Sequence, residues 1–200
     1  MRPISALLTG LAFAGSAFAS PATEAFVSDI ADRVETLEGP DIATEIVDLL
    51  DMKRIARFTL GRHARTFSDD DIQRFETGFE AFLLETMTQY ADRFESAEIA
   101  VIGSFDRNER DSIVETRVTF PGEDPYTVRW RLLERRGEWR VVDMQMFDLW
   151  LAIEQRAQLG SILSRRGATI DEALDALEVE TEQPKLEVAS AEDESTSRER

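Results

Sequence analysis

Residues 139–163 read WRVVDMQMFDLWLAIEQRAQLGSIL, and this stretch decides the fold. It begins with β-branched and aromatic residues typical of a strand, and it ends with the three- and four-residue apolar spacing of a helix. Strand–helix junctions are normally polar and exposed, whereas this one is bulky and apolar and contains no Gly or Pro. Its apolar members are Met144, Met146, Phe147, Leu149, Trp150 and Leu151. Such a junction must be covered, either by the protein or by a ligand.

Helical periodicity dominates the chain before residue 95. Apolar spacing predicts helices over 22–37, 42–50 and 52–60, with Gly61 placed to end the third. Ser68 is a suitable N-cap for the longest helix, and the acidic residues after it favour a helix start. The apolar stripe of that helix is Ile72, Phe75, Phe79, Phe82, Leu83, Met87, Tyr90 and Phe94.

Alternating apolar residues follow and predict strands. They begin near Ile99, near Val114 and at Tyr126, and Arg136-Gly137 predicts a hairpin turn into a fourth strand over 138–147. We therefore expect an α+β fold, in which helices pack on a four-stranded antiparallel meander with one strongly apolar face. A closing helix over about 148–166 and a short helix through Leu177 are expected to follow, the latter started by Thr169 and Glu172 at capping-box spacing.

The N-terminal segment has the pattern of a secretory signal peptide. Arg2 is followed by an apolar run and by Ala17-Phe18-Ala19, which predicts cleavage after Ala19. The expected organisation is a signal peptide over 1–19, one domain over 20–178, and a disordered acidic tail over 179–200. The chain has no Cys, and so it has neither disulfides nor a Cys for lipid attachment. Export without an anchor predicts a periplasmic protein in a bacterium with two membranes.

The composition is strongly acidic. The formal net charge is −17, and loss of Arg2 with the signal makes it one unit more negative. A chain of this charge is expected to repel nucleic acid and anionic lipid headgroups, and the sequence shows no basic patch with interleaved aromatic residues.

Few residues suggest catalysis. His63 is the single histidine, lies between arginines and has no partner for a metal site or a catalytic triad, so a surface or capping role is expected. Asp143 interrupts an apolar strand on the predicted side of Trp139 and Val141. It is either a general base of raised pKa, as in isomerases built from helices and a curved sheet, or a structural carboxylate paired with Arg129, Arg131 or Arg156. Arg156 either closes a pocket against a headgroup or pairs with a carboxylate.

The region from Phe26 to Leu177 resembles the MlaC family of periplasmic phospholipid-binding proteins, also called the toluene-tolerance auxiliary family. Trp139, Val141, Val142 and Asp143 fit its W-x-V-x-D strand. Its further positions are matched by Arg156, Gly167, Leu174 and Leu177, and upstream by Phe58, Leu60, Gly61, Phe75, Phe79, Leu83 and Leu84. The chain departs from the family at 147–150, where an acidic-Gly-x-Ser turn is usual, and at Met87, where an aromatic residue is usual.

The resemblance implies a curved sheet and helices that enclose an apolar cavity, as in nuclear transport factor two. It also implies a monomeric carrier without catalytic activity, cofactor or metal, which moves phospholipid between an outer-membrane lipoprotein complex and an inner-membrane ABC transporter. The expected lipid-binding residues are Phe75, Phe79, Phe82, Leu83, Met87, Val118, Val128, Trp130, Met144, Met146, Phe147 and Trp150. Two alternatives remain, namely an isomerase or dehydratase that uses Asp143 and a periplasmic adaptor without a ligand.

Overall fold

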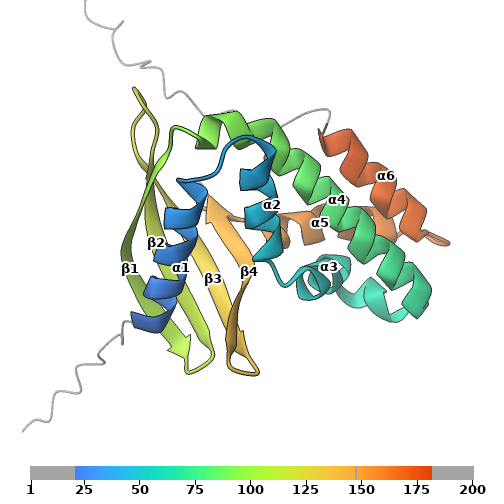
Figure 1. Cartoon of the computed structure of the whole chain (residues 1–200). Coiled ribbons are helices and arrows are strands. Elements are labelled where there is room, and N and C mark those ends of the chain that lie inside the picture. Colours follow the sequence, from blue (N-terminus) through green and yellow to red (C-terminus); the bar gives the residue numbers. More distant parts are fainter. Residues whose placement is uncertain (1–20, 147, 182–200) are drawn as a thin grey trace, which may run out of the picture.

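The computed structural model describes residues 21–146 and 148–181, without the side chains of 90, 92, 93 and 178–181. Helices come first in the chain, followed by strands and then by two further helices (Figure 1). The first group is α1 (Pro21–Val34), α2 (Pro40–Asp48), α3 (Met52–Leu60), the 3-10 helix η1 (Gly61–Arg65) and α4 (Asp69–Phe94). The last two helices are α5 (Leu151–Leu163) and α6 (Ile170–Thr181).

The described strands form one antiparallel sheet in the order β1-β2-β3-β4-β5. Its strands are β1 (Glu98–Asn108), β2 (Asp111–Thr119), β3 (Tyr126–Arg135), β4 (Glu138–Met146) and β5 (Leu149–Trp150). The expectation of four strands was wrong by one. Asp148 turns the chain with a positive φ of 63°, so that the two residues of β5 pair back onto Gln145 and Met146. The Arg136-Gly137 turn is confirmed, with both residues at positive φ.

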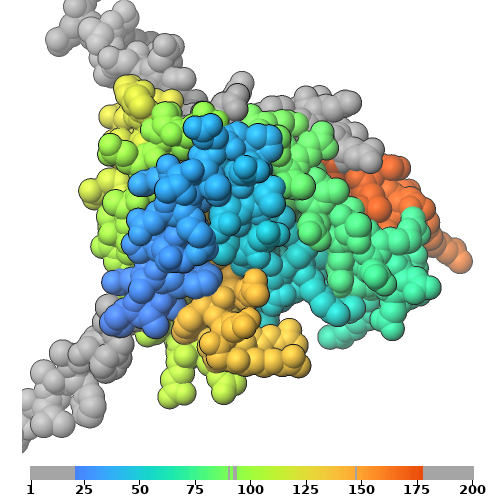
Figure 2. All heavy atoms as spheres, viewed as in Figure 1, coloured from blue at the N-terminus to red at the C-terminus, as the bar shows by residue number. Residues whose placement is uncertain are grey.

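One face of the sheet packs against α1, and we call it the inner face. Alternate residues of β2 and β3 point to it, and they form a buried cluster with Val27 of α1 and Val141 and Met144 of β4. We call this group the sheet cluster. Two polar contacts also fix α1 on the sheet, since Thr23 Oγ1 lies 3.1 Å from Ser112 Oγ and Ser104 donates to Glu24 over 2.6 Å. In the space-filling view, α1 and α2 cover the sheet on the viewer's side (Figure 2).

A second cluster is formed by helices alone. Buried residues of α3, α4, α5 and α6 pack together, including Phe75 and Phe79, whose rings stack at 5.6 Å between centroids. We call this group the helical cluster. Gly78 allows α4 and α6 to approach closely, because a Cβ at this position would lie 2.4 Å from Leu174 Cδ2. A third, smaller cluster joins α1 to α2 through Ile30, Val34, Ile42 and Ile46.

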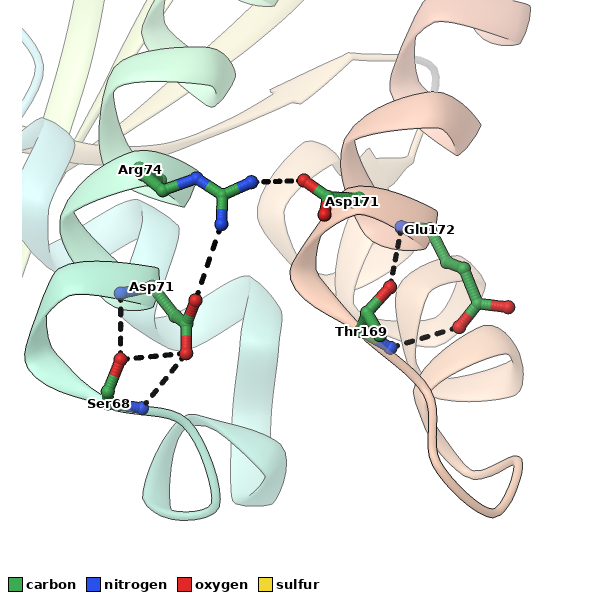
Figure 3. Close-up of polar contacts among 6 residues, drawn as sticks. All are labelled: Ser68, Asp71, Arg74, Thr169, Asp171 and Glu172. Carbon is green, nitrogen blue, oxygen red and sulfur yellow. Dashed lines mark hydrogen bonds and ion pairs between the residues drawn. The ribbon is translucent and has the colours of Figure 1, made fainter.

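Polar side chains fix the starts of α4 and α6 next to each other (Figure 3). Ser68 and Asp71 form a reciprocal capping box at the start of α4, and Thr169 and Glu172 exchange equivalent hydrogen bonds at the start of α6. Arg74 of α4 contacts both Asp71 and Asp171, so that it connects the two helix starts. Both capping positions had been expected from the sequence.

The link between α2 and α3 extends the sheet. Asp51 N–H donates to the Val141 carbonyl over 2.9 Å, and Val141 N–H donates to the Leu49 carbonyl over 3.2 Å. Leu50 thereby pairs in parallel with Val141 on the free edge of β4. This short bridge joins the sheet cluster to the helical cluster, because Leu50 packs against both.

The expected helices and strands agree with the structure to within a few residues at most ends. The largest difference is at α6, which continues to Thr181, four residues past its expected end at Leu177. Differences of three residues occur at the end of α1, at the start of β2 and at both ends of α5. The expected signal peptide, and the expected tail beyond Thr181, lie outside the described residues.

Candidate functional site

A β-bulge interrupts strand β4 near the start of residues 139–163. Asp143 pairs with Arg131 and Val141 pairs with Leu132, so Val142 is an extra residue in β4. Because opposite residues share a face, Asp143 lies on the face of Arg131, and Val141 lies on the face of Leu132. The expectation that Asp143 shares a side with Trp139 and Val141 was therefore wrong. The bulge moves Asp143 to the outer face and keeps Met144 in the sheet cluster.

Asp143 connects the end of the sheet to helix α5. Its Oδ1 atom accepts hydrogen bonds from the backbone N–H groups of Met144 and Ala152, both over 2.9 Å. Trp150 is the N-cap residue of α5 and provides no side-chain cap, so the carboxylate of Asp143 satisfies an otherwise free donor in the first turn. Burial raises the pKa of Asp143, while the two backbone hydrogen bonds and Arg131 oppose the shift.

Charged pairs surround Asp143 on the outer face. Arg131 binds Asp111 through two hydrogen bonds of 3.2 and 3.0 Å, and this interaction raises the pKa of its guanidinium. Arg129 donates to Glu115 over 2.6 Å and to Gln145 over 2.8 Å. These contacts occupy the arginines that had been considered as direct partners of Asp143. The carboxylate therefore has a structural role at the start of α5.

The expected lipid-binding residues of the strands lie together. Val118, Val128, Trp130 and Met144 are buried in the sheet cluster, and Met146 packs against it half-buried. Trp130 Nε1–H donates to Thr116 Oγ1 over 2.9 Å, which satisfies its polar atom on the inner face.

The expected residues of the long helix lie elsewhere. Phe75 and Phe79 are buried in the helical cluster, with Phe82 and Leu83 against it, whereas Met87 packs against the α1–α2 cluster. The expected lipid-binding residues are therefore distributed over all three clusters, and they do not form one continuous surface.

The protein itself covers much of the apolar junction. Met144, Met146 and Leu151 pack in or against the sheet cluster, and Trp150 is half-buried. Leu149, in contrast, remains 55% exposed. Phe147, which was also expected to bind lipid, lies outside the described residues.

Five apolar residues lie where clusters meet, and we call them the seam. All are half-buried, and each packs against two clusters: Phe26, Leu49, Leu50, Phe94 and Ile99. Sequence reasoning placed them on helical stripes or at a strand start, but it did not identify them as site residues. Each helix stripe shows which residues are apolar, whereas only the tertiary fold shows which of them contact two clusters.

Arg156 lies against α3 rather than against a carboxylate. Its guanidinium is 4.9 Å from the centre of the Phe58 ring, and a Cβ at Gly61 would lie 3.1 Å from its Nε atom. Among the described residues no carboxylate is within salt-bridge distance of it. The expected alternative of a bridge to an acidic group is therefore wrong for this part of the chain.

The described segments contain no group of three or more metal-ligating side chains. His63 lies on η1, where its Nε2 is 3.4 Å from Arg62 Nε. Within the same segments, no helix is sufficiently long and apolar to cross a bilayer.

Comparison with known proteins identifies a family and a fold. The family model described as MlaC protein matches residues 31–179. The chain is also similar to the solved structure of a phospholipid-binding protein from Ralstonia solanacearum, determined in complex with a phospholipid. That match has a TM-score of 0.65 at 20% identity and covers 82% of this chain and 97% of the other. No curated protein matches the chain.

Proposed function

The chain belongs to the MlaC protein family, and we propose that it is a carrier that binds a phospholipid by its acyl chains. Family membership is the observation that carries this proposal. The fold supports it, since nearly the whole of the Ralstonia protein, which was solved with a phospholipid, superimposes on this chain. The hydrogen bond that Asp143 accepts in the first turn of α5 gives this residue a structural role, which is consistent with a carrier.

A carrier is needed because acyl chains are costly to expose to water. Burial of one CH₂ group is worth about 0.8 kcal/mol, so two chains with some thirty methylenes represent roughly 20–25 kcal/mol. A phospholipid therefore crosses an aqueous compartment only when its chains are covered. The same magnitude makes spontaneous release slow, and release is then expected to require a partner that opens the protein.

We place the acyl chains at the seam, between the inner face of the sheet and α1, α2 and α4. The seam residues are apolar and half-buried, and they lie where separately packed clusters meet rather than inside one of them. Displacement along a boundary between clusters disrupts fewer contacts than opening a close-packed core. The inner-face residues Val128 and Trp130 would line the same space.

We also propose that this carrier is exported to the periplasm and is a monomer. There it would exchange lipid between an outer-membrane lipoprotein complex and an inner-membrane ABC transporter. The cavity expected from the resemblance to nuclear transport factor two is likewise proposed, as the space that opens at the seam when lipid enters.

The direct test is native mass spectrometry of the purified protein, followed by lipid extraction. We expect a bound phospholipid, or uptake of one from vesicles by protein that has been stripped of lipid. A protein that is lipid-free when purified and takes up no lipid would refute the carrier function.

A pair of matched substitutions tests the location. Leu49→Gln alters the seam, and Leu83→Gln makes the same change at a half-buried residue of the helical cluster. We expect the first to reduce bound lipid strongly and the second to leave it unchanged, with circular dichroism showing that both variants are folded. The opposite result would place the ligand along the helical stripe and refute the seam.

A further inference from the structure

The basic residues of this acidic chain are unevenly distributed. Residues 52–68 and 155–170 together carry eight of its 23 Lys and Arg residues and none of its 40 Asp and Glu residues. The eight are Lys53, Arg54, Arg57, Arg62, Arg65, Arg156, Arg165 and Arg166. Short basic segments are common in a chain with many charged residues, so the sequence alone does not show that these two segments form one surface.

The fold places the two segments next to each other. The first forms α3 and η1, and the second forms most of α5 and the turn after it. Arg156 of α5 covers the Phe58 ring of α3, and Arg62 of η1 donates to Ser164 Oγ at the end of α5 over 3.4 Å. Helices α3 and α5 therefore run side by side in the same direction, and they lie between β4 and α6, on the side of the sheet away from β1 (Figure 1).

Helical periodicity aligns the charges on this surface. Arg54, Arg57 and Phe58 are three and four residues apart on α3, so they share one side of it. Residues three apart in a 3-10 helix also share a side, which aligns Arg62 with Arg65. All eight basic side chains are exposed. We call this group, with Phe58 and Ile153, the basic surface.

Most of its charge is free to bind an external group. Glu76 pairs with Arg57 at 3.2 Å and Glu172 pairs with Arg165 at 3.7 Å, so two of the eight cations have acidic partners. No other basic residue of the surface has a carboxylate within salt-bridge distance among the described residues. Asp51 and Glu154 border the surface without such a contact, and so do the Asp residues at 69–71 and Asp171 at the starts of α4 and α6, where Asp71 and Asp171 pair with Arg74 instead.

Apolar side chains lie among these cations. Phe58 is 37% exposed and Ile153 is 53% exposed, the latter one helical turn before Arg156. Gly61 contributes to this arrangement, because its missing side chain lets Arg156 lie against the backbone beside Phe58. Basic residues that surround isolated aromatic and aliphatic side chains are typical of protein surfaces that bind the headgroup region of a bilayer.

We infer that the basic surface docks this protein onto an anionic phospholipid bilayer. Seven of the eight cations are Arg, which can bind a phosphate group through two hydrogen bonds. Protein–protein interfaces usually have cores depleted of charge, unlike this surface. The rest of the molecule carries all the acidic residues and is repelled by anionic lipid, so the protein would approach with the basic surface first. The inference extends the proposed carrier function by giving the carrier a direct contact with the membrane.

Flotation of the purified protein with vesicles tests the inference. We expect binding to vesicles of phosphatidylcholine with phosphatidylglycerol, weaker binding to phosphatidylcholine alone, and loss of binding at high salt. In the double variant Arg54→Glu with Arg65→Glu, the affinity for anionic vesicles should fall by about thirtyfold or more. Neither of these side chains makes a hydrogen bond or ion pair with a described residue, so the variant should fold.

A matched variant controls for net charge. Arg117→Glu with Arg135→Glu changes the charge equally on exposed strand positions away from α3 and α5, and it should alter the affinity by no more than about twofold. Equal losses in both double variants would overturn the inference, and so would the absence of binding to anionic vesicles. Binding of polyglutamate, but not of vesicles, would assign the surface to an acidic protein instead.

Bound phospholipid, measured in every variant by mass spectrometry, separates this inference from the carrier function. A basic-surface variant that keeps its lipid but does not float with vesicles supports the inference. Protein that contains no lipid and takes up none, yet still floats with anionic vesicles, would refute the carrier function and leave the docking surface intact.

Discussion

Substitution of Asp143 tests how the sheet holds helix α5. The Asp143→Ala change removes the acceptor of two backbone N–H groups in a site where the residue is only 6% exposed. Each buried donor left unsatisfied costs about 1–3 kcal/mol, so the loss of two hydrogen bonds should lower the free energy of unfolding by about 2–6 kcal/mol. For a domain of this size, that corresponds to a fall in Tm of roughly 5–15 °C.

The Asp143→Asn variant separates the acceptor from its charge. Asn retains an Oδ1 atom for the same two hydrogen bonds and avoids the cost of burying a carboxylate. We therefore expect its stability at neutral pH to be within about 1 kcal/mol of the parent protein. Urea unfolding followed by circular dichroism measures both variants. An Asn variant as unstable as the Ala variant would show that the negative charge, rather than the acceptor, holds α5. An Ala variant without loss would refute the capping role.

The same pair of proteins has a defined pH dependence. Because the pKa of Asp143 is raised in the folded protein, this group stabilises the fold below its ordinary pKa, and the contribution is lost as the pH rises through the raised value. The Asn variant lacks this contribution, so its stability relative to the parent protein should improve between acidic and neutral pH. Other carboxylates are common to both proteins and cancel in the difference. A constant difference across this range would contradict the raised pKa.

Three further substitutions test packing and polar satisfaction, all by thermal or urea unfolding. Gly78→Ala should destabilise the protein by about 1–3 kcal/mol, because the new Cβ would lie 2.4 Å from Leu174 Cδ2, and unchanged stability would show that the Leu174 side chain moves aside at little cost. Gly160→Ala is its control in another helix, with no atom within 4 Å of the new Cβ, and should stabilise by about 0.5–1 kcal/mol. Trp130→Phe should lower the free energy of unfolding by about 1–2 kcal/mol, because Thr116 Oγ1 no longer accepts a hydrogen bond from the buried indole N–H. A smaller effect would indicate that water replaces the indole N–H.

Local sequence signals predicted the elements well, because each depends on neighbouring residues. The capping residues Ser68 and Thr169, the Arg136-Gly137 turn and the 3.6-residue stripes are all read within one turn or one strand. The fifth strand was missed because it has only two residues and depends on the positive φ of Asp148. No apolar pattern of that length distinguishes a strand from the start of a helix.

The candidate site was harder to predict because it depends on register and on contacts between distant elements. Strict alternation placed Asp143 beside Val141, and a single extra residue at Val142 reversed that placement. The residues of the long helix from Phe75 to Met87 were all expected to bind lipid, although Phe75 and Phe79 pack among helices and Met87 packs against the α1–α2 cluster. The basic surface was missed for a similar reason, because its two halves are about a hundred residues apart in the sequence.

The pairing of Leu49–Asp51 with Val141 also constrains the order in which the chain can fold. During synthesis the α2–α3 link emerges some ninety residues before the strand that it pairs with. Helix α3 can complete its cluster only after α5 and α6 have been synthesised, and α1 can pack only after the sheet has been synthesised. Contacts so distant in sequence slow folding, so the nascent chain exposes the apolar side of α1 until the sheet is made, and that of α3 and α4 until α5 and α6 have followed β4. Truncation before β4 should therefore yield an aggregation-prone fragment rather than a folded helical unit.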